Sequence, residues 1–331
     1  MKLAAVPSIS RAAVAVAMLL STGIAPAQST GHSLSARSAA PVSPAGELGV
    51  AGAWERLPGC ARNIAAGTAD QVIVTGCEPR ASAVRDLFRY EAAGSSPGRF
   101  VPMGGQASAV AIGGPDSQGV WAIGPQGQVF ASTGGVFDKP TAAGTVSWVR
   151  VDFSATSIAA GPDSVWIVTT RPHVSPYGNV AAYGRLQCDV VGRGATPCRV
   201  TGWSELPIAA AQVALGDEPW IVDTQGTIQR LSAGRWQTVP GCARAIAARG
   251  AHVWILSCGA STQPGGQEVL QWTRQGWAPT GGYGQALAVD SRGDPWVVDA
   301  QGGIWHQRRQ RHPQPFSTVL SDQHRSSKER P

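Results

Sequence analysis

The chain has 331 residues, carries few charged side chains (15%) and is rich in glycine (41) and tryptophan (12). Glycine supplies turn conformations and aromatic residues fill half-buried strands, so this composition indicates short strands joined by tight turns. The formal net charge of +6 arises at the two ends of the chain, and the part between them is close to neutral. A near-neutral body argues against nucleic-acid binding, which requires a concentrated positive surface.

The first 27 residues have the pattern of a secretory signal peptide. Lys2 and Arg11 provide positive charge, an apolar run follows, and Ala25-Pro26-Ala27 is a small-x-small cleavage site. The apolar run is about half of the ~20 residues that a membrane span requires. We therefore favour export with cleavage near Ala27 over a membrane anchor, and no later segment is apolar enough to span a membrane. The mature protein is expected in a periplasm or outside the cell.

Six segments of the remaining chain repeat one pattern. Each opens with an aromatic residue, has an aliphatic residue ten positions later, and has Ala directly after it. A Gly- or Asp-containing turn follows, then a strand with Trp in five of the six copies, a second turn and a closing apolar strand. The opening aromatics are Trp54, Phe100, Trp148, Trp203, Trp236 and Trp277. The aliphatic-Ala pairs are Ile64-Ala65, Val110-Ala111, Ile158-Ala159, Val213-Ala214, Ile246-Ala247 and Leu287-Ala288.

Four short strands in a unit of about 40 residues are typical of a propeller blade. The sequence therefore predicts an all-β fold, a six-bladed β-propeller of four-stranded antiparallel blades over residues 54–319. Residues 28–53 are expected to form a linker, and residues 320–331 a basic, disordered tail. Either the Trp54 strand or the segment Pro315–Val319 completes the ring, and we favour both chain ends meeting in one blade.

Two further residue types recur at fixed places in the repeat. Five positions after the opening aromatic, four of the six segments have glycine. The recurrent tryptophans occupy one strand position, and both faces of most blades pack on neighbours, so we expect these rings in the core. The glycines are Gly59, Gly105, Gly241 and Gly282, and the tryptophans are Trp121, Trp166, Trp220, Trp254 and Trp296.

Hairpin geometry pairs the six cysteines. Residues opposite each other in an antiparallel hairpin have a constant sum of indices, and opposed non-hydrogen-bonded positions have Cα atoms about 4.5 Å apart, within disulfide range. Three disulfides fit an oxidising compartment. There is no C-x-x-C motif and no nearby His spacing, so we expect no metal site at the cysteines. The predicted disulfides are Cys60–Cys77, Cys188–Cys198 and Cys242–Cys258.

The order of opening Trp, Gly, aliphatic-Ala, Gly turn and Val-Trp resembles the tectonin repeat, over roughly residues 54–319. The segments that begin at Pro219-Trp220 and Pro295-Trp296 fit best, since each continues into a Gln-Gly turn and an Ile strand. The first repeat departs with Ile73 in place of Trp, the third lacks a clear Gly-x-Ile-Tyr closing strand, and the fourth closes with Gln229. The resemblance implies a six-bladed propeller and, because several tectonin-type propellers are lectins, binding of glycans or lipopolysaccharide.

Aromatic residues outside the repeat pattern are candidates to stack on sugars. Arg62 and Arg244 stand two residues before the aliphatic residue of two Cys-containing repeats, and strand alternation places them on the same face as that residue. Their guanidinium groups would allow bidentate contact with a carboxylate or phosphate on a glycan, although solvated arginines without a ligand fit the same pattern. The aromatic candidates are Trp272, Tyr283, Trp305, Tyr177 and Tyr183.

Three functions are compatible with these observations. We favour an exported, monomeric, lectin-like protein that binds a glycan or envelope glycolipid without a cofactor. The second hypothesis is a protein-interaction scaffold that uses the propeller rim and the insertion at 171–201. The third is a propeller hydrolase or lyase, which needs carboxylates or histidines on the inner strands. His173 and His252 are the only plausible bases within the ring, and no catalytic or phosphate-binding motif is present, so we expect no enzyme.

Overall fold

The computed structural model describes residues 53–68, 70–78, 84–93, 96–133, 136–137, 146–188, 198–259 and 263–308. The predicted signal peptide, nearly all of the predicted linker, the segment Pro315–Val319 and the basic tail lie outside the described residues. Within those ranges, no helix has the length and hydrophobicity that crossing a membrane requires.

The described residues form 23 β-strands and a single 3-10 turn, η2 (Pro115–Ser117), and the strands pair antiparallel in five sheets. One sheet comprises β2 (Ala61–Ala66), β3 (Val72–Gly76), β4 (Arg85–Ala93) and β5 (Ser96–Ala107). A seven-stranded sheet comprises β6 (Ala109–Gly113), β7 (Gly119–Ile123), β8 (Gln128–Ser132), β9 (Trp148–Ala160), β10 (Ser164–Pro172), β11 (Asn179–Cys188) and β12 (Cys198–Ala210).

The other three sheets have four strands each. One comprises β13 (Gln212–Leu215), β14 (Pro219–Val222), β15 (Ile228–Ser232) and β16 (Arg235–Val239). The next comprises β17 (Ala243–Arg249), β18 (His252–Ser257), β19 (Gln267–Thr273) and β20 (Gly276–Gly284). The last comprises β21 (Ala286–Val289), β22 (Pro295–Val298), β23 (Ile304–Gln307) and β1 (Trp54–Leu57).

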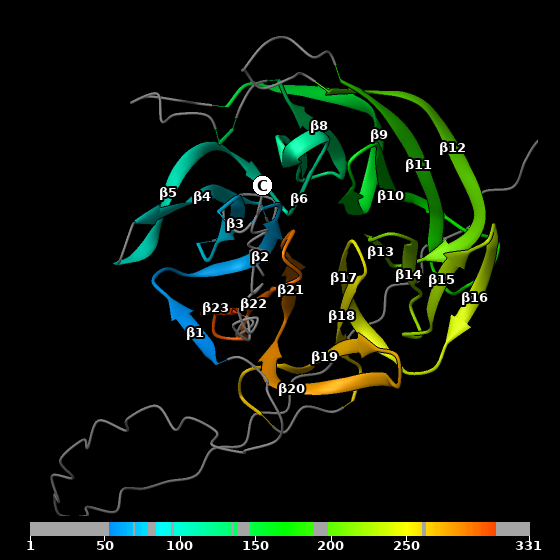
Figure 1. Ribbon diagram of the computed structural model, residues 1–331. Helices are drawn as coiled ribbons and strands as arrows, with labels where there is room; N and C mark the ends of the chain where they lie inside the picture. Colours follow the sequence, from blue (N-terminus) through cyan, green and yellow to red (C-terminus); the bar gives the residue numbers. More distant parts are fainter. Residues whose placement is uncertain are drawn as a thin grey trace, which may run out of the picture. The chain divides into compact units, whose positions relative to one another are not determined.

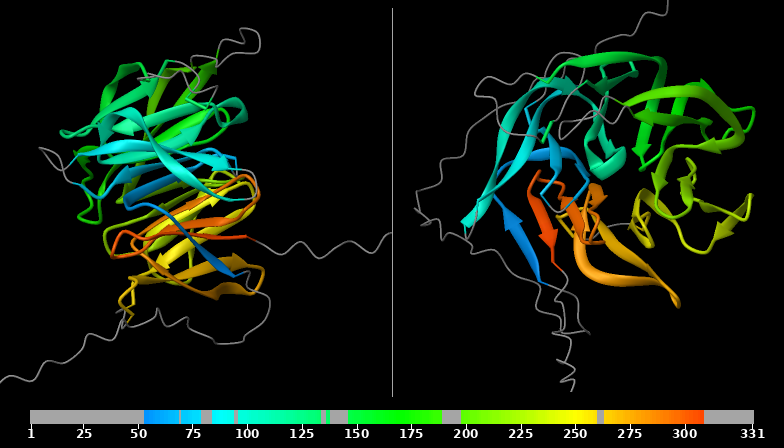
Figure 2. Two further views of the ribbon diagram at one scale, coloured as in Figure 1. Left: turned by 90° about the vertical axis from the view of Figure 1, so that its left-hand side faces the viewer. Right: turned by 45° about the horizontal axis from the view of Figure 1, so that its top comes forward.

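The innermost strands stand around a central axis (Figures 1 and 2). In ring order they are β2, β6, β9, β13, β17 and β21, and β21 lies next to β2. Each is the first strand of a hairpin, so we call β2–β3, β6–β7, β9–β10, β13–β14, β17–β18 and β21–β22 the inner hairpins. Antiparallel four-stranded sheets arranged in this way form a β-propeller. The all-β class and the propeller architecture are therefore confirmed, and the number of six blades stays a prediction.

The two ends of the described chain meet in one sheet. The N-terminal strand β1 pairs antiparallel with β23, with Trp54 opposite Gln307 and Leu57 opposite Ile304. The strand that begins at Trp54, one of the two alternatives left open by the sequence, thus completes the sheet that the last repeat begins. Joining the first and last strands in this way removes two open sheet edges.

The ring has two faces, which we define by the connections they carry. The turn face carries the turns of the inner hairpins, and the disulfide face carries the connections between the second and third strands of the sheets. Backbone hydrogen bonds join adjacent sheets on both faces. On the turn face, Ser291 N donates to Gly67 O (2.7 Å). On the disulfide face, Ala61 N donates to Gly302 O (2.9 Å).

The inner hairpins alternate between two kinds around the ring. In β2–β3, β9–β10 and β17–β18 the register shifts by one residue, which leaves a bulged residue on the first strand. The other three inner hairpins pair in regular register. The bulged residues are Arg62, Thr156 and Arg244. The bulge interrupts the strict alternation assumed from sequence, and Arg62 is exposed although Ile64 is buried.

Each regular hairpin leads into a Gln-Gly turn that bonds to the next bulged hairpin. The glycine of each turn has a positive φ, which favours glycine at this position. Its carbonyl accepts a hydrogen bond from the residue just before the bulge. The pairs are Ala155 N to Gly127 O (2.7 Å), Ala243 N to Gly226 O (3.0 Å) and Ala61 N to Gly302 O (2.9 Å). The structural repeat of the chain is therefore a pair of hairpins that occurs three times.

Two of the three predicted disulfides lie in bulged hairpins. Cys60–Cys77 and Cys242–Cys258 each join Cα atoms 5.5 Å apart, as the hairpin geometry predicted. The β11–β12 register places Cys188 opposite Cys198, and the side chains of these two residues lie outside the described part. The third bulged hairpin has Ser154 in place of a cysteine.

The recurrent tryptophans are buried, as expected from their shared strand position. Trp121, Trp254 and Trp296 are 1% exposed and belong to the largest fully buried side chains. The core is divided into clusters that fill the spaces between neighbouring sheets. One cluster packs Ile64 and Val74 of the β2–β5 sheet against Trp296 of the last sheet.

The recurrent glycines make room for the opening aromatic of the following repeat. A side chain at Gly105 or Gly241 would place its Cβ 2.8 Å from the indole of that aromatic, closer than atoms pack. The pairs are Gly59 with Phe100, Gly105 with Trp148, Gly241 with Trp277, and Gly282 with Trp54. The last pair acts across the closure of the ring, where the Trp54 indole also donates to Thr280 O (3.3 Å).

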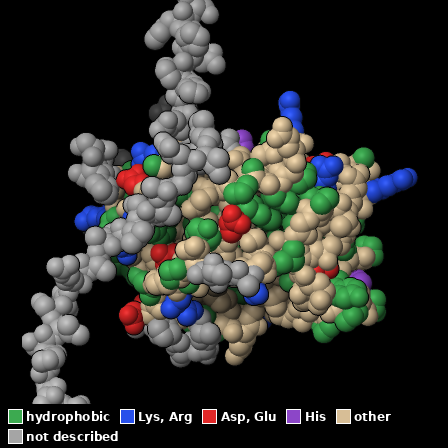
Figure 3. All heavy atoms as spheres, turned by 90° about the horizontal axis from the view of Figure 1, so that it is seen from below, with side chains coloured by type: hydrophobic (Ala, Val, Ile, Leu, Met, Phe, Trp, Pro, Cys, Tyr) green, Lys and Arg blue, Asp and Glu red, His purple; other side chains and the backbone are tan. Residues whose placement is uncertain are grey.

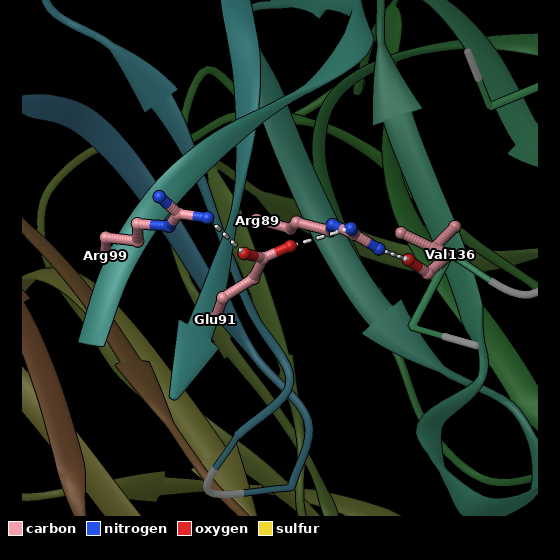
Figure 4. A network of polar contacts seen from close by, with 4 residues as sticks. All are labelled: Arg89, Glu91, Arg99 and Val136. Atoms are coloured by element: carbon pink, nitrogen blue, oxygen red, sulfur yellow. Dashed lines mark hydrogen bonds and ion pairs between the residues drawn. The ribbon is translucent and has the colours of Figure 1, made fainter. Parts of the chain in front are cut away.

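A polar network joins the β2–β5 sheet to the segment that follows β8 (Figure 4). Arg89 on β4 donates from Nη1 to Val136 O (3.0 Å) and from Nη2 to Glu91 Oε1 (2.9 Å). The other oxygen of Glu91 accepts from Arg99 on β5 (3.4 Å). Glu91 thereby orients Arg89, which connects two neighbouring sheets.

Substitution of Gly282 by Ala tests the steric role of the recurrent glycines. Gly282 has no positive φ, so the added methyl group acts mainly through overlap with Trp54. We expect Gly282→Ala to lower the free energy of unfolding by about 1–3 kcal/mol, measured by urea denaturation. Gly259→Ala is the matched control, because nothing lies within 4 Å of its Cβ position. Equal stability of the two variants would contradict the packing role.

A third hairpin disulfide can be introduced at Ser154 and Thr170. The pairing of Ala155 with Thr169 reproduces that of Ala61 with Gly76, so the two positions correspond to Cys60 and Cys77. We expect Ser154→Cys with Thr170→Cys to form a disulfide under oxidising conditions and to raise the free energy of unfolding by about 3 kcal/mol. Thiol titration and urea denaturation measure this, with the single Ser154→Cys variant as control. Two thiols that stay reactive after oxidation would contradict the equivalence of the hairpins.

Candidate functional site

The disulfide face presents both arginines predicted as ligand contacts. Arg62 and Arg244 are exposed and occupy the same bulge position in two equivalent hairpins. Arg62 Nη1 lies 3.4 Å from Ala300 O, which is a long contact for a hydrogen bond. Ala243, the residue before Arg244, bonds to the Gln-Gly turn at Gly226. Each arginine therefore stands beside the turn of the preceding hairpin.

Tyr177 and Tyr283 lie on the same face. Tyr177, in the connection between β10 and β11, is 50% exposed, and its carbonyl accepts a hydrogen bond from Thr224 N (2.8 Å). Tyr283 on β20 is half-buried and packs beside Gly265. Gly265 O accepts a hydrogen bond from Ala300 N (2.9 Å), just as Tyr177 O accepts one from Thr224 N. Gly265 therefore occupies the backbone position that Tyr177 occupies in its own sheet.

These contacts define two similar corners of the disulfide face. In both, an arginine at a bulge lies beside the Gln-Gly turn that follows the preceding inner hairpin, and a tyrosine lies next to that turn. The tyrosines stand at different positions, because Tyr177 lies in the connection after β10 whereas Tyr283 lies on β20 beside Gly265. The first corner contains Arg62, Gln301 and Tyr283, and the second contains Arg244, Gln225 and Tyr177. The corresponding third position around the ring has Thr156 in place of arginine.

The other three aromatic candidates make contacts within the protein. Trp272 is half-buried against Trp220 and Trp277, with ring centroids 6.1 and 4.9 Å away. Tyr183 stacks on Trp166 at 5.2 Å. These two rings fill space between strands and sheets, and their predicted role in ligand binding stays untested.

Trp305 is held on β23 by a hydrogen bond from its indole to Asp299 Oδ2 (2.8 Å). Arg56 lies over the Trp305 ring, 5.9 Å from its centroid, in cation–π geometry. Trp305 thus forms part of the last sheet's outer packing, and ligand contact by this ring also stays a prediction.

A cavity of about 100 Å³ follows the ring axis. The recurrent aliphatic-Ala pairs of all the inner strands line it, which gives that sequence signal a structural meaning. Among the described residues that line the cavity, no Asp, Glu or His occurs. A hydrolase or lyase that works from this cavity would therefore have to draw its acid and base from elsewhere.

Arg249 closes the turn-face end of the cavity. Its side chain extends from β17 to the β6–β7 hairpin on the other side of the ring, where Nη1 donates to Ile112 O on β6 (3.2 Å) and Nη2 to Ser117 Oγ in the turn. Burial lowers the pKa of Arg249, and the negative charge of Asp290 acts in the opposite direction. The guanidinium thus compensates a buried carboxylate while it connects opposite sides of the ring.

Asp290 belongs to a recurrent turn motif. Its Oδ1 accepts from the backbone N–H of Arg292 (2.8 Å) and Asp294 (3.1 Å), two and four residues ahead. Asp223 and Asp299 bond the backbone in the same way. The correspondence extends to the tryptophan six residues after the aspartate, since the Trp296 indole bonds to Asp290 as the Trp305 indole bonds to Asp299.

His306 lies beside Asp290 in the interior of the last sheet. Its ring stacks on Trp296 with a centroid distance of 3.9 Å, and its Nε2 lies 3.8 Å from Asp290 Oδ2. Burial, with the positive charges of Arg308 and Arg292, lowers the pKa of His306 to about 3. The ring is therefore neutral at physiological pH, and its approach to Asp290 is not an ion pair.

Sequence interpretation missed this cluster because its members come from the β21–β22 turn and from β23, and none of the three residues belongs to a recognisable motif. His252, one of the two predicted bases, lies against Gly293 of the same turn. His173, the other, accepts a hydrogen bond from Ser175 N at the disulfide face (3.0 Å). The two histidines therefore lie at opposite faces and do not form a joint site.

On the side of the molecule that Figure 3 presents, arginine and acidic side chains are scattered among apolar and neutral ones.

No protein-family model matches the chain, and no curated protein matches it. Solved structures similar to it are β-propellers of varied description. A streptogramin B lyase is 12% identical with a TM-score of 0.40, and the match covers 78% of this chain and 98% of the lyase. The WD40 propeller domain of Doa1 is 9% identical with a TM-score of 0.46, covering 79% and 97% of the two chains.

A third similar structure is the propeller domain of Myceliophteria thermophila Cps50 (Swd1), 7% identical with a TM-score of 0.44 and coverage of 77% and 99%. At such identities and TM-scores these likenesses assign no function. The resemblance to tectonin repeats stays a prediction from the sequence pattern.

Replacement of Arg249 tests its structural role. Arg249→Met removes two hydrogen bonds and leaves Asp290, which is 0% exposed, without its compensating charge. We expect the free energy of unfolding to fall by about 2–3 kcal/mol, measured by urea denaturation. Arg274→Met, at an exposed turn after β19, is the control and should change stability by less than about 0.5 kcal/mol. A loss no larger than the control's would show that Arg249 is dispensable.

Proposed function

We propose that the protein is an exported, non-catalytic binding protein that recognises an anionic glycan or envelope glycolipid at its disulfide face. The observation that carries the proposal is the repetition of an exposed arginine at the same bulge, beside a Gln-Gly turn and a tyrosine, at two corners. An exposed arginine is ordinary by itself. Two in matching positions, each held by a defined backbone, form a repeated surface feature.

The chemistry of the two corners suits an acidic sugar. A guanidinium binds a carboxylate or phosphate through two parallel hydrogen bonds. A tyrosine ring offers an apolar face and a hydroxyl group, which suits contact with a sugar ring. Arg62 is exposed, and its contact with Ala300 O is long at 3.4 Å. This guanidinium is therefore accessible to a ligand.

The proposal includes six blades. We infer that the seven-stranded sheet combines two blades that share β9, whose first part pairs with β8 and whose last part pairs with β10. Support comes from the six inner hairpins around one axis and from the six sequence copies with an offset of ten. The finer assignment to the tectonin type has the same sequence support.

Export is supported by the two disulfides. Such bonds persist in oxidising compartments and are rare in the cytosol. Both lie under the disulfide face, where they fix the strands that carry Arg62 and Arg244. The pattern of residues 1–27 agrees with passage through a secretory route.

A protein-interaction scaffold is the second candidate, and one observation favours it. Val174 is fully exposed and Tyr177 is half-exposed on the same connection of the disulfide face. Exposed apolar side chains of this kind suit a protein partner. A partner whose binding is unaffected by competing acidic saccharides, and is lost in Val174→Ser, would favour this function over glycan recognition.

The test is a glycan array probed with the oxidised protein and two charge-matched double variants. We expect Arg62→Gln with Arg244→Gln to weaken binding of acidic glycans at least tenfold, as for the loss of charge-assisted hydrogen bonds. Arg235→Gln with Arg274→Gln removes the same charge from the other end of the strands and should leave binding unchanged.

Other outcomes contradict the proposal in distinct ways. If both double variants lose glycan binding equally, the attraction is non-specific. The same conclusion follows if moderate salt alone abolishes binding by the natural sequence, because the basic C-terminal residues contribute to such attraction. Absence of binding to every glycan and to lipopolysaccharide would reject glycan recognition and leave the scaffold function.

A further inference from the structure

We propose that Asp290, Asp294 and His306 form a binding site for one divalent first-row transition-metal ion, for which Zn²⁺ is the appropriate probe. The three side chains offer one nitrogen and two carboxylate oxygens, and these ligand atoms all lie within 4.8 Å of one another. The two aspartates come from the β21–β22 turn and the histidine from strand β23. The site is independent of the proposed ligand surface, which lies on the other face.

The state of His306 is the observation that points to a ligand. The residue is 4% exposed, and neither Nδ1 nor Nε2 has a hydrogen-bond partner among the residues that the structure describes. A buried polar atom without a partner costs about 1–3 kcal/mol, and such atoms are uncommon in folded proteins. The stacking on Trp296 fixes the ring plane, and Nε2 lies toward Asp290 Oδ2 at 3.8 Å. A bound ion would satisfy this nitrogen.

The spacing is close to that of a metal site. Two ligand atoms about 2.0–2.2 Å from one Zn²⁺ ion lie about 3.4 Å apart at a tetrahedral angle. The 3.8 Å between Asp290 Oδ2 and His306 Nε2 therefore needs only a small adjustment. Asp294 follows the turn closed by Asp290 and is 6% exposed, so its carboxylate is also confined near the same point.

The donor set selects the class of metal. Imidazole nitrogen with carboxylate oxygen suits Zn²⁺ and its first-row neighbours, whereas Ca²⁺ and Mg²⁺ take oxygen ligands. Asp290 Oδ1 stays bonded to the turn backbone, which holds the carboxylate in place as an outer support.

Such an ion would stabilise the place where the ring closes. It would join the β21–β22 turn to β23, the strand that receives β1. The same turn bonds to Gly67 of the neighbouring hairpin through Ser291 N (2.7 Å). Metal binding is thus expected to raise stability, since an ion that binds only the folded state shifts the unfolding equilibrium.

The experiment measures thermal unfolding of the untagged, EDTA-treated full chain with ZnCl₂, CaCl₂ or neither. We expect Zn²⁺ at a hundredfold excess over its Kd to raise Tm by about 5–10 °C, and Ca²⁺ to have no effect. Elemental analysis after dialysis should find about one zinc per chain. His306→Gln and Asp294→Asn should abolish both results, while His173→Gln, which removes a histidine at the disulfide face, should retain them.

The proposal is overturned if Zn²⁺ leaves the Tm of the natural sequence unchanged and no zinc is retained. It is also overturned if His306→Gln keeps the full shift, or if Ca²⁺ acts as strongly as Zn²⁺. Should His306→Gln fail to fold, Asp294→Asn and the zinc content of the natural sequence decide the question. Glycan binding plays no part in these measurements, so this proposal and the proposed function fail separately.

Discussion

The ring depends on the contact between the recurrent glycine of four repeats and the opening aromatic of the repeat that follows each. Because an aromatic side chain lies where a Cβ would otherwise stand, as at Gly241 and Trp277, adjacent sheets approach closely and bury their faces. The same contact closes the ring between Gly282 and Trp54, residues from opposite ends of the described chain. Hydrophobic clusters between the sheets then bury further apolar surface, but the glycines set how closely neighbouring sheets approach each other.

Much of the fold was predictable because the sequence repeats its packing contacts. The constant offset between aromatic and aliphatic-Ala pair indicated propeller sheets, and hairpin geometry indicated the disulfides Cys60–Cys77 and Cys242–Cys258. The alternation of hairpins was not predicted, because a one-residue bulge leaves no sequence signature apart from the repeated Cys-Ala-Arg. The buried cluster was missed because the register of β22 with β23 is required to bring His306 beside Trp296 and Asp290.

The two faces of the ring have different physical characters that follow from the alternation. On the disulfide face, the bulges turn Arg62 and Arg244 toward solvent and the disulfides hold their strands, so exposed charge is presented on a rigid frame. On the turn face, Arg249 and Asp290 are drawn inward, where they connect opposite sides of the ring. The proposed recognition therefore uses the disulfide face, whereas the backbone bonds that close the ring lie on both faces.

Hydrogen exchange with and without the best-binding acidic saccharide tests the assignment of recognition to the disulfide face most directly. The account predicts that the ligand slows exchange at residues 60–63, 223–227, 242–245 and 299–303. It predicts no change at the hairpin turns of the opposite face, residues 250–252 and 290–294. Protection confined to those turns, or to the rim, would contradict the account, because the bound ligand would then contact neither Arg62 nor Arg244.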